Sequence, residues 1–143
     1  MKKELKLLKE WTINYLKNKD ILTKFIEEID ESPKEWDIVI KTKTGEKFYL
    51  VLPKIGDFGE IAKKIDGKNV TVVALNTKEN LDVLVKNWDK AAKHPGLCVI
   101  FVNPDSELEK KWIIFPYTHD KITERKSLEK GLNAMFQTVD SWK

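Results

Sequence analysis

The chain of 143 residues has only one cysteine, one arginine and two histidines. A single cysteine, Cys98, excludes a disulfide within the chain and any zinc site built from several thiolates. Cys98 stands inside the apolar run 97–102. An apolar setting keeps a thiol protonated, so we expect a small buried core residue rather than a nucleophile.

Arginine is almost absent, because Arg125 is the only one and all other basic residues are lysines. The net charge of +3 is too small to indicate nucleic-acid binding by itself. Arginine is the commonest reader of guanine edges, whereas lysine acts as a point charge on phosphate. Any nucleic-acid binding is therefore expected to lack sequence specificity. Abundant Lys and Glu are also typical of the ion-paired surfaces of thermophile proteins, which would explain the lysines without a ligand.

Long apolar runs are missing too, since none reaches the roughly 18 residues that span a bilayer. Residues 1–8 are amphipathic and lack the apolar stretch of a signal peptide, so we expect a cytoplasmic protein without a membrane partner. Hydrophobic residues make up 41% and charged residues 34%, which favours a globular fold over disorder. The length, without repeats or a linker, favours a single domain over residues 1–143.

Hydrophobic periodicity predicts secondary structure along the first third of the chain. Apolar residues at helical spacing predict one helix over 3–17 and a second near 20–31. Residues 36–42 and 46–53 then predict a β-hairpin, with Gly45 in its turn because glycine adopts a positive φ at little cost.

The remainder alternates between helices and strands. A short helix is expected near 59–65, and a strand over 69–75 precedes a helix over 76–93. The continuous apolar run 97–102 is typical of a strand covered on both faces, so these elements predict a parallel βαβ unit. A strand over 111–116 and a helix near 124–140 follow. The sequence therefore predicts an α/β fold with a mixed central sheet flanked by helices.

Two charged residues of the hairpin carry a resemblance to a known family. Asp37 stands at the start of one predicted strand and Lys54 at the end of the next. With the order of elements over about 3–103, they resemble the restriction-endonuclease-like superfamily, known by its PD-(D/E)xK motif and including Holliday junction resolvases. The resemblance implies an α-β-β-β-α-β core, to which residues 111–140 add a strand and a helix. In that family an Asp and the motif carboxylate hold Mg²⁺, which activates water, and the lysine orients the water or stabilises charge.

The motif carboxylate is missing whichever strand is matched to it. If Leu52-Pro53-Lys54 stands for (D/E)xK, the lysine is present and leucine replaces the acid. If Ala74-Leu75-Asn76 stands for it, both functional residues are absent. Leucine and alanine cannot ligate Mg²⁺, which requires oxygen donors. A rescue requires a relocated carboxylate, for which the candidates are Asp57, Glu60 and Glu79.

These observations leave three functional hypotheses. The first is a catalytically inactive nuclease-like domain that binds DNA or RNA without sequence specificity or acts as a protein-interaction module, with Asp37 and Lys54 as remnants of the site. The second is an Mg²⁺-dependent nuclease with a relocated glutamate. The third is an unrelated small α/β scaffold that binds a small molecule or forms a homodimer. The lysines expected to contact phosphates in the first case are Lys41, Lys43, Lys63 and Lys64.

A second polar cluster, residues 117–121, follows the strand at 111–116. It contains His119 and Asp120, a pair able to perform acid–base chemistry or bind a metal. Successive residues of a strand point to opposite faces, so the two side chains converge only in a turn. A loop in which they make capping and hydrogen-bonding contacts is the favoured interpretation.

Overall fold

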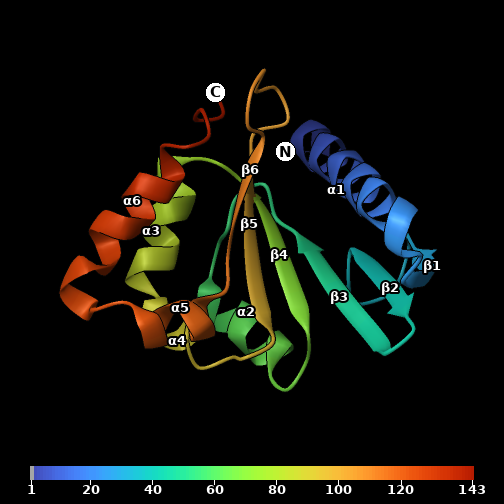
Figure 1. The fold of residues 1–143 in the computed structure, drawn as a ribbon, viewed down its shortest axis with the longest axis horizontal. Helices are drawn as coiled ribbons and strands as arrows, with labels where there is room; N and C mark the ends of the chain where they lie inside the picture. The colour runs from blue at the N-terminus through green and yellow to red at the C-terminus, as the bar shows by residue number, and fades with distance from the viewer. Residues whose placement is uncertain (1) are drawn as a thin grey trace.

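A six-stranded mixed sheet forms the centre of the molecule in the computed structural model, which describes residues 2–143 (Figure 1). The strands are β1 (Ile26–Asp30), β2 (Ile38–Thr42), β3 (Gly45–Val51), β4 (Val70–Leu75), β5 (Leu97–Val102) and β6 (Lys111–Ile114). The helices are α1 (Lys2–Thr23), α2 (Phe58–Ile65), α3 (Lys78–Lys86), α4 (Trp88–Ala91), α5 (Pro116–Ile122) and α6 (Leu128–Phe136), with a 3₁₀ turn, η1 (Arg125–Ser127), before α6.

The strands lie in the sheet in the order in which they occur along the chain. β1, β2 and β3 form an antiparallel meander, β3, β4 and β5 run parallel, and β6 returns antiparallel to β5. The predicted α/β fold with a mixed sheet is therefore confirmed, as is the parallel pairing of β4 with β5. The hairpin is also confirmed, with Gly45 at a φ of 139° in its turn.

The two faces of the sheet are covered differently. On one face, strand residues pack against apolar residues of α2, α3, α4 and α6, with the buried Trp88 and Phe101 among the largest side chains. On the other face lies α1, which contributes the buried Leu8 and Leu16 (Figure 1). Within residues 2–143 no helix is long and apolar enough to cross a membrane. Among the described residues, α1 is thus the only helix that contributes side chains to the core on this second face.

The predicted helix over 20–31 is wrong, because α1 continues to Thr23 and residues 26–30 form β1. Lys24, at a φ of 49°, ends the helix, and the Asp20 carboxylate accepts hydrogen bonds from the next two backbone amides. A register shift between Ile26 and Glu28 then interrupts the pairing of β1 with β2. The extra residue brings Ile26 and Ile29 to the same core, and their spacing of three imitates a helix.

Three further boundaries differ from the prediction. The helix over 76–93 is interrupted at Asn87, whose side chain donates to the Val83 carbonyl and so competes with helical hydrogen bonding. The strand predicted over 111–116 ends at Ile114, because Pro116 begins α5, where proline is tolerated. Residues 117–121 are therefore helical rather than a loop, and the last helix is limited to α6.

Candidate functional site

A cavity of about 360 Å³ lies where the parallel strands β3 and β4 end. Ligands of open α/β sheets commonly bind beyond the carboxyl ends of parallel strands, where loops can supply different side chains without disturbing the sheet. The residues that line this cavity are Glu4, Pro53, Lys54, Leu75, Thr77, Glu79 and Trp142. Its walls thus combine apolar side chains with one lysine and two glutamates.

Asp37 has a structural role at the edge of the hairpin. Its carboxylate oxygen Oδ2 accepts a 2.7 Å hydrogen bond from the Val51 backbone amide, and its own amide donates to the Tyr49 carbonyl at 3.0 Å. The half-buried side chain therefore extends the β2–β3 ladder by one residue. It does not line the cavity that contains Lys54.

Leu52, which stands where the PD-(D/E)xK motif has a carboxylate, is a packed residue. The Leu52 side chain packs against the main core, and its amide donates to the Val73 carbonyl at 2.8 Å. Lys54 is exposed and lines the cavity. In the alternative match, Ala74 and Asn76 are both fully buried. Neither strand therefore presents a carboxylate at the motif position.

The three candidates for a relocated carboxylate lie in different places. Asp57 caps α2 by accepting a 2.8 Å hydrogen bond from the Gly59 amide, and Glu60 is in the first turn of the same helix. Glu79 lines the same cavity as Lys54. In the part of the chain that the structure describes, no three His, Cys, Asp or Glu side chains are grouped so that they could hold a metal ion.

The four lysines expected to contact phosphates belong to two separate elements. Lys41 and Lys43 are on the β2–β3 hairpin, where Lys41 pairs with Glu28 at 3.5 Å. Lys63 and Lys64 are on α2. The Lys64 ammonium group lies 4.7 Å from the centre of the Trp36 ring and donates to the Glu35 carbonyl. Lys41 and Lys64 thus already contact neighbouring groups of the protein, and the four lysines do not belong to one element.

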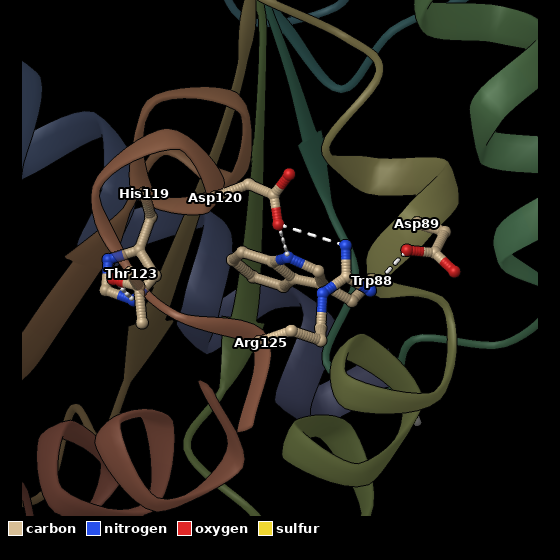
Figure 2. A network of polar contacts seen from close by, with 6 residues as sticks. All are labelled: Trp88, Asp89, His119, Asp120, Thr123 and Arg125. Carbon is tan, nitrogen blue, oxygen red and sulfur yellow. Dashed lines mark hydrogen bonds and ion pairs between the residues drawn. The ribbon is translucent and has the colours of Figure 1, made fainter. Parts of the chain in front are cut away.

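The cluster around Asp120 stabilises the packing of α4, α5 and η1 (Figure 2). The Asp120 carboxylate accepts hydrogen bonds from Trp88 Nε1 at 2.9 Å and Arg125 Nη2 at 3.2 Å. Arg125 also pairs with Asp89 at 2.5 Å. Because Trp88 is buried, Asp120 satisfies an indole N–H that would otherwise lack a partner.

His119 points away from this carboxylate (Figure 2). Its Nε2 is 3.3 Å from the Thr123 hydroxyl, and its ring meets the Trp88 ring edge-to-face at 5.7 Å. Successive residues of a helix project about 100° apart, which separates His119 from Asp120. The two side chains therefore do not contact each other, and they make their hydrogen bonds from a helix and not from the loop that the favoured interpretation expected.

A surface of lysines and aromatic rings on the α1 side was not expected from the sequence. Lys19 and Lys111 lie 5.7 and 5.5 Å from the centre of the Tyr15 ring, and Lys47 lies 5.8 Å from that of Phe25. Tyr15 and Lys19 are four residues apart on α1, so helical spacing predicts their contact. Lys111 reaches Tyr15 only through the tertiary fold, and no local signal predicts it.

Cys98 lies beside this surface and is half-buried. Burial raises the pKa of its thiol to about 11, although Thr71, Lys19 and Lys47 oppose the shift. The thiol is therefore protonated at neutral pH, which agrees with a packing role and not with a nucleophile.

Comparison of the chain with protein-family models, with curated proteins and with solved structures finds no match in any of the three.

Proposed function

We propose that this chain is a nuclease-like domain without a working catalytic centre, which binds nucleic acid without sequence specificity. The observation that carries the proposal is the arrangement of Asp37 and Leu52 in the β2–β3 hairpin. The Asp37 carboxylate is occupied by the Val51 amide, and the apolar Leu52 stands where the motif carboxylate is expected. A cytoplasmic location is part of the same proposal.

The order of elements supports the nuclease-like part. From α1 to β4 the chain forms a helix, three strands, a helix and a strand, an α-β-β-β-α-β order within residues 2–75. This order uses β1 and α2, whereas the order expected from the sequence extended over residues 3–103 and used the helix at 76–93 and the strand at 97–102. In this alignment β3 takes the place of the motif strand. Asp37 and Lys54 then fall at the family positions, which favours Leu52-Pro53-Lys54 over the alternative match at residues 74–76.

The lysines support nucleic-acid binding. Lysine-rich surfaces attract phosphates through charge alone, which gives affinity without base recognition. The surface around Tyr15 and Phe25 adds aromatic groups to three lysines, a combination that suits nucleic acid better than a simple polyanion.

The test combines binding with cleavage. Labelled DNA and RNA oligonucleotides are titrated at low and physiological salt, and plasmid and branched DNA are incubated with Mg²⁺ or Mn²⁺. We expect binding that weakens with salt, because phosphate contacts release counterions, and no cleavage. Cleavage that disappears in both Asp37→Asn and Lys54→Ala would contradict the proposal. Glu107→Gln, which removes an exposed carboxylate elsewhere, is the matched control.

One observation favours a second candidate, a Mg²⁺-dependent nuclease with a relocated glutamate. Glu79 lines the same cavity as Lys54, so a carboxylate and a lysine lie near each other beyond the ends of β3 and β4. If this candidate holds, Glu79→Gln should abolish cleavage while Glu60→Gln, at the start of α2, should leave it intact.

A further inference from the structure

Part of the α1 side of the sheet is not covered by any helix in the described structure. Leu8 and Leu16 of α1 pack on the sheet, whereas Thr71 of β4 and Cys98 of β5 remain half-buried. On the neighbouring edge strand β6, Ile113 is half-buried, and Phe115, one position beyond the strand, is 55% exposed. We call these four residues the open sheet face.

Strand alternation brings these side chains to the same side. Ile113 packs with the α1-side core, and Lys111 and Phe115, two positions away in each direction, share its orientation. Thr71 pairs directly with Cys98 and with Tyr49 in the sheet register. The residues of the open sheet face therefore lie on the same side of the neighbouring elements β4, β5 and β6.

Three lysines border this surface. Lys19 and Lys111 approach the Tyr15 ring, and Lys47 projects from β3 on the same side as Tyr49. Lys19 and Lys47 also line one groove, of about 80 Å³, and both are close enough to Cys98 to act on its pKa. The lysines thus surround the open sheet face from α1, β3 and β6.

Few negative charges oppose them. Asp20 lines the groove, but its carboxylate accepts hydrogen bonds from the amides of Phe25 and Ile26 at 2.7 and 3.0 Å. Glu109 pairs loosely with Lys111 at 3.9 Å. Within residues 2–143 no carboxylate forms an ion pair with Lys19 or Lys47. The surface therefore has uncompensated positive charge.

We propose that the open sheet face and its three lysines bind single-stranded nucleic acid, an inference that rests on the proposed nucleic-acid function. The positive charge of the three lysines favours a ligand with several negative charges. The half-buried Ile113 and the exposed ring of Phe115 favour a ligand that has flat apolar groups between its anionic ones. A single strand offers both, since its unpaired bases can stack on an aromatic ring while its phosphates contact lysines. In a duplex the bases are paired and cannot reach Ile113 and Phe115.

The experiment measures fluorescence anisotropy of a labelled oligonucleotide of about 12 nucleotides, a length within the usual site size for such surfaces. It is tested as single-stranded DNA, as single-stranded RNA and as the corresponding duplex. The variant K19Q/K47Q/K111Q is compared with K86Q/K90Q/K93Q, which removes the same charge from exposed lysines around α3 and α4 on the opposite side. Circular dichroism verifies that each variant is folded.

We expect the single strand to bind more tightly than the duplex. The first triple variant should lose about tenfold in affinity. The slope of log K against log salt, which is negative, should become less steep by about 2, since each of the three lost phosphate contacts contributes about 0.7. The control triple should change affinity by less than about twofold, because its lysines lie on the other side. Phe115→Ala should weaken single-strand binding by about fivefold or more and leave duplex binding unchanged.

The possible failures separate the two proposals. Equal binding of duplex and single strand, with no effect of Phe115→Ala, would overturn the single-strand inference and leave nucleic-acid binding intact. An equal loss in both triple variants would overturn the assignment of this surface. Absence of any binding at low salt would overturn the proposed function itself.

Discussion

Trp112 Nε1 donates a 2.8 Å hydrogen bond to the side-chain oxygen of Asn76, and both residues are buried. The Asn76 amide group donates in turn to the Val139 carbonyl at 3.0 Å, and its backbone carbonyl accepts from the Trp142 amide at 2.9 Å. One residue after β4 thus connects β6 to the C-terminal tail. The Asn76 side chain both accepts and donates in this arrangement, which a lysine side chain, a donor only, could not do.

Replacing Asn76 by alanine should destabilise the protein by about 2–4 kcal/mol, because a buried indole N–H and a buried carbonyl lose their partner. The free energy of unfolding, measured by urea denaturation, gives the effect. Asn14→Ala, an exposed site on α1, is the control and should change it by less than about 0.5 kcal/mol. A loss below about 1 kcal/mol at Asn76 would show that water replaces the side chain.

The sequence predicts those elements whose periodicity is undisturbed. The hairpin, the βαβ unit and α2 are found because each apolar pattern matches one kind of structure. Residues 20–31 are different, since the register shift in β1 gives Ile26 and Ile29 a helical spacing. Pro116 is a second such case, since a proline at this position is compatible both with the end of a strand and with the start of α5. At residues 20–31 the pairing of β1 with β2 selects the structure, whereas at Pro116 the same residue is compatible with two local structures.

A second prediction concerns Asp120. Asp120→Ala should cost about 1–3 kcal/mol, because the buried Trp88 Nε1 loses its acceptor. Asp89→Ala removes only an exposed ion pair with Arg125 and should cost less than about 1 kcal/mol. Thermal or urea unfolding of the two variants gives the comparison. Equal effects would mean that the charge on Arg125, and not the indole, is the important partner.

Lys24 allows a stabilising substitution. Its φ of 49° lies in the left-handed region, where a side chain is disfavoured and glycine is not. Lys24→Gly should therefore raise the free energy of unfolding by about 0.5–1 kcal/mol. Lys17→Gly, in the interior of α1, removes the same charge and should lower it by about 1 kcal/mol. Destabilisation by Lys24→Gly would indicate that its backbone is not held in this conformation.

The candidate site is less predictable than the fold. Asp37 and Lys54 could be selected from the sequence because they stand at the start and at the end of the predicted hairpin strands. Whether Asp37 ligates a metal or caps a strand depends on its distance from Val51, fourteen residues away along the chain. The convergence of Lys19, Lys47 and Lys111 depends on three elements and has no motif. Local patterns therefore identify single residues, whereas their grouping requires the tertiary structure.

The ionisation of Cys98 and Tyr49 predicts a loss of stability in alkali. Burial raises the pKa of the Cys98 thiol from its ordinary value of 9.0 to about 11. Burial likewise raises the pKa of the Tyr49 hydroxyl from 10.0 to about 12. Above pH 9 the unfolded chain releases protons that the folded chain retains, so the free energy of unfolding should fall as the pH rises.

Replacing Cys98 by alanine separates the two groups. In this variant the alkaline decline should begin about one pH unit later, near pH 10, because burial raises the pKa of both Tyr49 and Tyr15 from their ordinary value of 10.0 and these groups still titrate. Urea unfolding at a series of pH values measures the decline, and reaction of the native thiol with a disulfide reagent tests its protonation directly. That reaction should be slow at neutral pH and accelerate up to about pH 11, where the thiolate forms. Rapid reaction at neutral pH would mean that the thiol is not buried enough to have a raised pKa. An alkaline decline that Cys98→Ala leaves unchanged would mean that ionisation of Cys98 does not contribute to the loss of stability.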